Sequence, residues 1–445
     1  MLIQVAVTER KRDRFARSAE VALSRFMLST PYFLTLVKNP GEFRLLNELT
    51  IDSAGEHFGG CVIRLFDAHK IMGDRMANLR QSRIDLPSEW ADEPFRRYQK
   101  DHPIIIDPAT EHMYYLAELG KWATDERIHP KIREFANGLF KARKRKTSRV
   151  WRKERNLTLW NYDMIKDPAL EHDVISGFFD AELHYGSCAL LAPGPLVTDI
   201  ADLETAIEIN KLAKTDAIDK DAEFANYLIV ASDAILDKAL RESLADFLAR
   251  SPVDLNFLKF KFLNLRYARR RLLKAYVDFY RRLAEIREQN KEKVFCVLEN
   301  DCQAYVSAAV AFDLVSTSMT GFDRYPKGKS VEGFGGLFSV SELAHIEFEE
   351  YKEAYVNNGE RPLCDHKPCQ HIDPRTVTKS AWYAVRRKDY ALCMNDLMTR
   401  IENYVRDSNI EMARQDVTNS FMSPLKELIP THWEATEAER IQLSP

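Results

Sequence analysis

Four side chains that can bind a soft or borderline metal ion fall within eight residues of the C-terminal part of the chain. The candidate ligands are Cys364, His366, Cys369 and His371. Zinc takes thiolate sulfur and imidazole nitrogen in a tetrahedron, and the turn that Pro368 favours would fold this stretch around one ion. The alternative is a polar surface loop with free thiols. The close spacing favours zinc.

This spacing indicates a structural zinc site more than a catalytic one. The Cys-x-His-x-x-Cys cluster supplies three ligands, and one more would leave no open coordination position. His371 is nearest in the sequence, whereas Asp389 and Cys393 lie on a predicted helix downstream. These three residues remain the candidates for the fourth ligand.

The composition is typical of a globular protein from a reducing compartment. The 445 residues are 45% hydrophobic and include 24 phenylalanines, which is ample for a packed core. The formal net charge is only −3, so binding to nucleic acid would depend on a local basic surface. Seven irregularly spaced cysteines make no disulfide framework. Neither a signal peptide nor a membrane span is indicated, so we expect a soluble, cytoplasmic protein without a membrane partner.

Short apolar runs alternate with helical patterns along most of the chain. Predicted strands cover 29–37, 104–107, 188–192, 227–232, 294–298 and 313–318, and predicted helices cover 42–49, 112–156, 173–185, 200–214, 236–249, 264–290 and 303–311. Six to eight such units predict an α/β protein with a (β/α)8 TIM-like barrel and helical insertions. The basic stretch 9–28 is predicted to be an amphipathic helix.

The chain divides into three predicted parts. Residues 1–345 would form the barrel with its basic helical insertions. Residues 346–433 would form a zinc-binding subdomain with closing helices, among them 379–407. Residues 434–445 are predicted to be a polar tail.

Basic residues gather in two of the predicted helices. The first group includes Lys144 and Arg145, and the second includes Arg266, Arg269 and Arg270 among tyrosines. Clustered positive charge repels itself unless an anion lies against it, and phosphate is the usual anion. The alternative for both groups is a solvated helix face.

One carboxylate stands where barrel enzymes place catalytic groups. Asp107 follows the apolar run 104–106 and precedes a proline, so it would end a parallel strand and face a ligand. The alternative is that Asp107 caps the helix that begins near Thr110. The two roles are compatible.

Five short segments, in this order, resemble the tRNA-guanine transglycosylase superfamily, whose members are zinc-bearing (β/α)8 barrels that exchange a guanine base in RNA or DNA. In chain order, they are similar to five features of that family: the opening T-P-x-F strand and the Asn-Pro that follows it, the aspartate at a strand end, the strand that carries the nucleophile, the C-x-C-x-x-C zinc cluster and the helix after the last zinc ligand. The segments are Thr30–Asn39, Ile106–Asp107, Ala311–Ser316, Cys364–Cys369 and Tyr390–Ile401.

Several positions depart from that family. Asp107 is followed by Pro-Ala where the family has Ser-Gly-Gly, and Ala231 stands where a base-reading glutamine is expected. Ser316 takes the place of the nucleophilic aspartate, with Asp313 three residues earlier. The histidine expected as the fourth zinc ligand is missing. The resemblance therefore supports the fold more than recognition of the same base.

The resemblance implies an enzyme of guanine or 7-deazaguanine transglycosylase type that acts on DNA or tRNA, with structural zinc and a homodimeric assembly. Base exchange needs one acid that attacks the anomeric carbon and one that moves a proton. The catalytic candidates are Asp107 and Asp313, with Asp323 in reserve, unless Asp313 is a carboxylate satisfied within the core. The candidates for substrate binding are Lys144, Arg145, Ser232, Arg266, Arg269 and Arg270. The alternatives are a non-catalytic nucleic-acid-binding barrel and a glycosylase that cleaves the base without replacing it.

Overall fold

The computed structural model describes residues 5–9, 17–52, 57–72, 94–114, 116–144, 168–261, 270–298, 304–318, 337–340, 343–346, 366, 376, 378–407 and 409–420.

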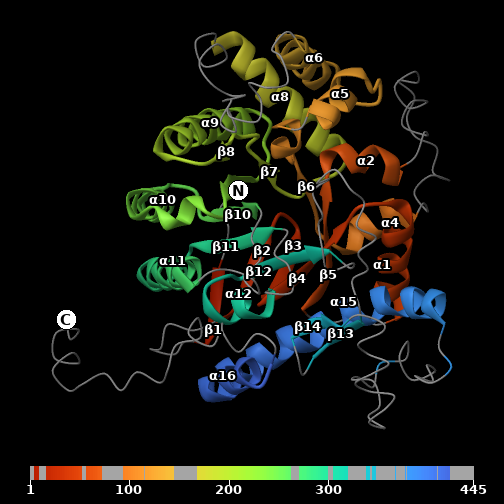
Figure 1. Cartoon of the computed structure of the whole chain (residues 1–445), viewed down its shortest axis with the longest axis vertical. Helices are drawn as coiled ribbons and strands as arrows, with labels where there is room; N and C mark the ends of the chain where they lie inside the picture. Colours follow the sequence, from red (N-terminus) through yellow and green to blue (C-terminus); the bar gives the residue numbers. More distant parts are fainter. Residues whose placement is uncertain are drawn as a thin grey trace.

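Eight parallel strands form a nearly closed barrel at the centre of the molecule (Figure 1). Their order around the barrel is their order in the chain, and the last strand pairs in register with the first. The strands are β4 (Tyr32–Val37), β5 (Phe58–Arg64), β6 (Ile104–Asp107), β7 (Leu190–Leu191), β9 (Phe224–Ala231), β10 (Leu255–Lys261), β11 (Val294–Leu298) and β12 (Leu314–Ser318). The predicted α/β class and TIM-like barrel are confirmed. We call the end where the strands finish the barrel mouth and the opposite end the barrel base.

The junction between β6 and β7, which we call the seam, is the least regular part of the barrel. The backbone N–H of Cys188 donates to the carbonyl of Ile104 at 2.8 Å. The next hydrogen bond runs from the Ile106 N–H to a side chain, the hydroxyl of Ser187, at 3.0 Å. The short β8 (Leu196–Val197) pairs with β9 beside this region.

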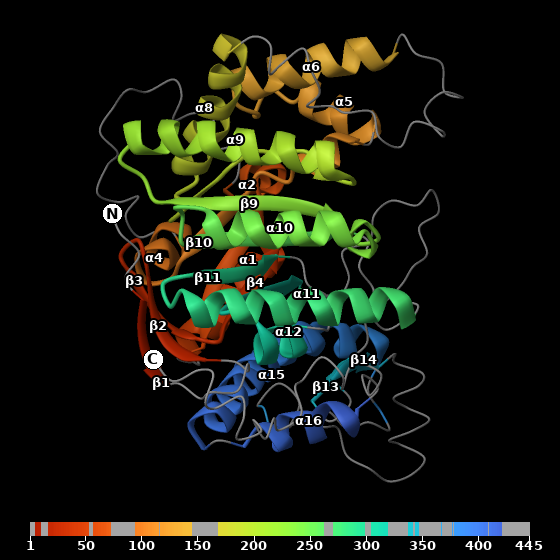
Figure 2. The ribbon, with the colours of Figure 1, turned by 90° about the vertical axis from the view of Figure 1, so that its left-hand side faces the viewer.

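Helices surround the barrel. In Figure 2, α9, α10 and α11 lie side by side across the strands, and Figure 1 shows α5, α6 and α8 together above α9, on which α8 packs. The helices are α1 (Pro40–Asp52), α2 (Leu65–Met72), α4 (Pro94–Asp101), α5 (Leu116–Thr124), α6 (Pro130–Lys144), α8 (Pro168–His184), α9 (Ile200–Asp219), α10 (Lys238–Arg250), α11 (Arg270–Gln289), α12 (Ala304–Val310), α15 (Lys379–Asp407) and α16 (Ile410–Thr418). Two 3-10 helices, η2 (Thr110–Tyr114) and η3 (Ala234–Leu236), follow β6 and β9. Within the described ranges, every helix is too short or too polar to cross a lipid bilayer.

Two hydrophobic cores follow from the alternation of side chains along the strands. On β10, Leu255 and Phe257 belong to the core inside the barrel, whereas Leu258 and Phe260 pack outward against the helices. Lys259 and Lys261 share the phase of Leu255 and Phe257, so they also point inward, nearer the barrel mouth. The barrel interior is therefore apolar toward the barrel base and charged toward the barrel mouth.

A small antiparallel sheet covers the barrel base. It consists of β1 (Val5–Glu9), β2 (Ser18–Leu23) and β3 (Phe26–Thr30). Val21 and Leu28 pack into the inner core of the barrel. The predicted helix over 9–28 is therefore wrong. In β2, buried side chains alternate with more exposed ones, which is the period of a strand.

The C-terminal part contains the hairpin of β13 (Leu337–Ser339) and β14 (Ala344–Ile346), which packs against α15. The helix α15 also packs on α1, α12 and β4. The predicted polar tail, 434–445, lies outside the described residues.

Candidate functional site

Four buried charged side chains meet inside the barrel, toward its mouth. Lys259 Nζ lies 2.5 Å from Asp107 Oδ2 and 2.6 Å from Glu111 Oε1. Lys261 Nζ lies 2.9 Å from the same Glu111 oxygen. All four side chains are at most 3% exposed. We call these residues the charged cluster.

The carboxylate of Asp107 is held on both oxygens. Its Oδ1 accepts hydrogen bonds from the Tyr227 hydroxyl at 2.7 Å and from the Ala109 N–H at 2.9 Å, while Oδ2 accepts from Lys259. The contact with Ala109 forms a turn just before η2, so Asp107 combines the strand-end position with a turn-forming role. Its orientation is fixed by three elements, β6, β9 and β10, as a preorganised site requires.

The charges of the cluster compensate one another. Burial alone would raise the pKa of Glu111, but the ammonium groups of Lys259 and Lys261 outweigh burial and hold that pKa well below its usual range. Two lysines thus face two carboxylates. A neutral ligand would fit this interior better than an anion, because an anion would compete with Asp107 and Glu111 for the lysines.

Other polar groups lie around the cluster. Arg64 ends β5 next to Asp107 in the sheet register, and its guanidinium is 2.6 Å from the carboxylate of Asp67. Burial lowers the pKa of His112, which favours a neutral imidazole beside Glu111. Ser316 on β12 is fully buried, and no described residue makes a hydrogen bond to its hydroxyl.

Asp313 lies at the barrel base, because it immediately precedes β12, and so it is far along the barrel axis from Asp107. Arg17 Nε is 2.8 Å from Asp313 Oδ1, and Arg287 Nη1 is 3.2 Å from the same oxygen. The prediction that Asp107 and Asp313 converge on one substrate is therefore wrong. The alternative, a carboxylate satisfied within the core, describes Asp313.

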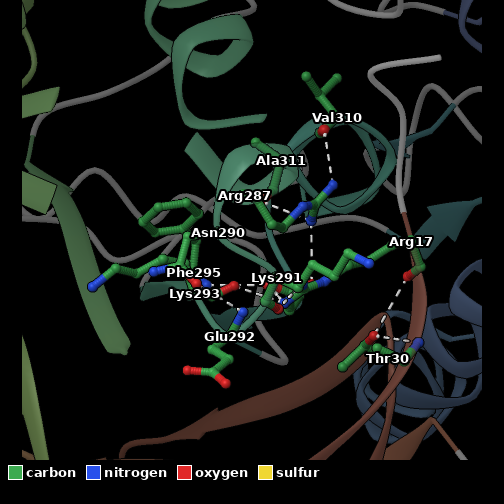
Figure 3. A network of polar contacts seen from close by, with 12 residues as sticks. Arg17, Thr30, Arg287, Asn290, Lys291, Glu292, Lys293, Phe295, Val310 and Ala311 are labelled. Carbon is green, nitrogen blue, oxygen red and sulfur yellow. Dashed lines mark hydrogen bonds and ion pairs between the residues drawn. The ribbon is translucent and has the colours of Figure 1, made fainter. Parts of the chain in front are cut away.

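Figure 3 shows the network to which this ion pair belongs. Arg17 donates to the carbonyls of Lys291 and Lys293 at 2.6 and 2.7 Å, and Arg287 donates to the carbonyl of Ala311 at 2.9 Å. The two guanidinium groups join the N-terminal sheet, α11 and the start of β12. This network fastens the sheet to the barrel base.

The predicted substrate-binding residues are only partly described. Ser232 follows β9 and is buried; its N–H donates to the Lys261 carbonyl, and its own carbonyl accepts from the Tyr276 hydroxyl. Arg270 is the exposed first residue of α11. Only the backbone of Lys144, at the end of α6, is described. Asp323, Arg145, Arg266 and Arg269 lie outside the described residues.

A second group of side chains could hold a metal ion. Candidate ligand atoms of His366, Asp389 and Cys393 all lie within 4.8 Å of one another. Asp389 and Cys393 are four residues apart on α15, so they share one face of that helix, and both are buried. Cys393 and Asp389 were two of the three candidates for a fourth ligand.

The imidazole of His366 is oriented as metal ligands are. Its Nε2 lies 2.7 Å from Asp396 Oδ2, and its Nδ1 lies 3.2 Å from Asp389 Oδ1 and 3.7 Å from Cys393 Sγ. A histidine ligand usually donates its other N–H to a carboxylate in this way. The imidazole thus lies between two carboxylates, and either a protonated ring or a cation bound at Nδ1 would satisfy this arrangement. Cys364, Cys369 and His371 lie outside the described residues.

The chain matches neither any model of a protein family nor any curated protein to which it was compared. The site must therefore be judged by its own chemistry. Sequence reasoning found Asp107, His366 and Cys393 but missed Glu111, Lys259 and Lys261. The two lysines, at alternate positions of an otherwise apolar run, were the signal that could have revealed them.

Proposed function

We propose that the chain is a base-exchange enzyme of transglycosylase type, acting on a guanine or 7-deazaguanine in DNA or tRNA. The observation that carries this proposal is the rigidly held carboxylate of Asp107 at the barrel mouth, where barrel enzymes build their active sites. Cleavage of a glycosidic bond develops positive charge on the sugar, and a fixed carboxylate can stabilise or attack that centre. Asp107 is the residue that would do so.

The lysines of the charged cluster support this role. Lys259 holds one oxygen of Asp107 and Tyr227 holds the other, so the carboxylate need not reorganise as charge develops on the sugar. A neutral nucleobase suits the charged cluster, because the positive charges of its two lysines balance the negative charges of its two carboxylates. Asp313 takes no part, since it lies at the barrel base.

The negatively charged backbone of the nucleic acid would contact the start of α11. Arg270, Arg271 and Lys274 are exposed in its first turns. This helix follows β10, the strand that carries both lysines of the cluster, so it begins on the side of the barrel mouth. Phosphate binding by such a basic rim is independent of sequence and weakens with salt. The basic residues predicted at 266 and 269 immediately precede it.

We further propose that His366, Asp389 and Cys393 bind zinc. Imidazole, carboxylate and thiolate are all ligands of zinc, and a fourth ligand from Cys364, Cys369 or His371 would close a structural site. Zinc here would join the segment around His366 to α15. By the family resemblance, this region would also be the one through which the chain forms a homodimer.

Replacing Asp396 with asparagine should lower zinc affinity by about 10–100-fold, because the carboxylate that orients His366 is lost. The measurement is competition for zinc with a chromogenic chelator. Asp407→Asn, an exposed change in the last turn of the same helix, is the matched control and should bind zinc like the wild type. Equal affinities for wild type, Asp396→Asn and Cys393→Ala would rule out zinc at this site.

The proposed function is tested by incorporation of labelled guanine and 7-deazaguanine precursors into tRNA and into duplex DNA. Asp107→Asn should reduce the rate by a factor on the order of 10³ or more, because the amide cannot attack or stabilise the sugar. Asp254→Asn is the matched control, since Asp254 precedes β10 at the barrel base. It should exchange base at the wild-type rate.

The remaining outcomes distinguish the alternatives. Release of free base with an abasic product would identify a glycosylase. Tight binding of nucleic acid without label or product, unaffected by Asp107→Asn, would identify a non-catalytic binding barrel. Either result would overturn base exchange.

A further inference from the structure

A buried carboxyl group occupies the seam of the barrel. The Leu190 N–H donates to the Glu223 carbonyl on the β9 side at 2.8 Å. Successive N–H groups of a strand point to opposite edges, so the Leu191 N–H points toward β6. There it donates to Glu182 Oε2 at 2.9 Å. Glu182, near the end of α8, thus takes the place that a backbone carbonyl of β6 would take in a closed barrel.

The β6 side of the seam ends at a residue of the charged cluster. On β6, the Ile106 N–H donates to the Ser187 hydroxyl, and the next residue is Asp107. The side chains of Glu182, on α8, and Ser187, between α8 and β7, therefore replace strand-to-strand hydrogen bonds in the upper part of the seam. Within the part of the chain that the structure describes, Glu182 Oε1 has no hydrogen-bond partner, although the side chain is fully buried.

This environment favours the neutral form of Glu182. Burial raises the pKa of Glu182 well above its usual range; the Leu191 N–H lowers the pKa in part, and the negative charge of Asp107 raises it again. Asp180 and His184, on the same helix, are half-buried and exposed, and Asp180 pairs with Lys220 of α9. Asp107 is the charged group of the cluster that acts on Glu182.

We infer that Glu182 is the proton donor of the barrel site, acting beside Asp107 on the leaving base. The inference rests on the proposed base exchange and adds a catalytic residue to it. The C–N glycosidic bond breaks, an oxygen of Asp107 bonds to the anomeric carbon, and the proton of Glu182 passes to the departing base. The incoming base then reverses each step and returns its proton to Glu182, so the exchange is redox-neutral.

The other groups of the cluster suit this task less well. Lys259 already forms ion pairs with two carboxylates, and Lys261 forms one with Glu111. Among the described residues, the Glu182 carboxyl group contacts only the Leu191 N–H, and Oε1 has no partner there. The raised pKa of Glu182 keeps its carboxyl group neutral, which is the form that a proton donor needs.

The test compares Glu182→Gln with the wild type, because glutamine keeps an oxygen for the Leu191 N–H but cannot give up a proton in its place. Asp173→Asn, an exposed change on the same helix, is the matched control. The exchange rate of Glu182→Gln should fall by about 10²–10⁴-fold with little change in KM. Asp173→Asn should match the wild type.

A second measurement detects the proton on Glu182 and does not depend on enzymatic activity. Above the ordinary glutamic acid pKa of 4.5, the unfolded chain has lost this proton and the folded chain keeps it. Wild-type stability should therefore fall with rising pH relative to Glu182→Gln, by up to about tenfold in the unfolding equilibrium constant per pH unit above about pH 5, as long as the folded chain keeps the proton. Denaturant unfolding at several pH values measures this difference.

Identical pH dependence in wild type and Glu182→Gln would overturn the inference. A lost pH dependence with an unchanged exchange rate would overturn the donor role. If the wild type showed no base exchange but its stability still depended on pH differently from that of Glu182→Gln, the proposed function would be refuted. Glu182 would then be a buried protonated group without a role as donor. Should Glu182→Gln fail to fold, Glu182→Asp retains a proton-bearing group, and a wild-type rate in that shortened variant would contradict a donor placed by the seam.

Discussion

Replacing Asp313 with alanine is expected to lower the free energy of unfolding by about 3–5 kcal/mol, because the change leaves buried positive charge without its partner. Arg17 and Arg287 both bond this carboxylate, and they are at most 8% exposed. Burial already lowers the pKa of Arg287 to about 10, against the opposing effect of Asp313. Denaturant unfolding of the purified variant measures the loss.

The control for this prediction is Asp246→Ala, which removes an exposed ion pair with Arg250 on α10. Such a pair contributes less than about 1 kcal/mol. A stable Asp313→Ala protein without exchange activity would show that the carboxylate has a catalytic role after all. A destabilised one with activity in its folded fraction would confirm the structural role.

Replacing Lys259 with methionine should cost about 3–5 kcal/mol of unfolding free energy at pH 7, since Asp107 and Glu111 would remain buried with only Lys261 nearby. The loss should shrink in acid. In the wild type, the lowered pKa of Glu111 contributes stability that is present above its unfolded pKa and lost as the pH falls. The variant lacks much of this contribution, so the two stabilities should approach each other as the pH falls below the ordinary glutamic acid pKa of 4.5 toward the lowered pKa of Glu111.

Lys238→Met, at an exposed pair with Glu242, is the matched control and should be nearly neutral at either pH. Equal stability of Lys259→Met and wild type at pH 7 would contradict a charged cluster in the barrel interior. The same variant also tests the positioning of Asp107, because its exchange rate at saturating substrate should fall even where the protein is folded.

The barrel could be predicted because most of its strands are short apolar runs between helices. The strand at 294–298 and the long helix at 379–407 have the predicted bounds. Two strands of the barrel were missed, β5 and β10. Gly59 and Gly60 weaken the strand pattern of β5, and the inward lysines of β10 interrupt its apolar phase. The two lysines that obscured the strand pattern of β10 are the lysines of the charged cluster.

The placement of the two aspartates shows how strand direction decides a site. Asp107 ends an apolar run, and Asp313 begins one. In a parallel barrel, these positions lie at opposite ends, so their order relative to the strand already separated them. Glu182 and Glu111 could not be found in this way. They reach the site from helices, and only tertiary packing brings those helices to the seam and the cluster.

The pairing of the first barrel strand with the last has a consequence for synthesis of the chain. β4 spans Tyr32–Val37, and its partner β12 spans Leu314–Ser318. Arg17 likewise pairs with Asp313, which is 296 residues further along the chain. On the ribosome, one edge of β4 therefore stays open until most of the chain has emerged. An open strand edge is a template for pairing with other chains. During its production this protein should be most prone to aggregation just before residue 318 appears, and most dependent then on chaperones.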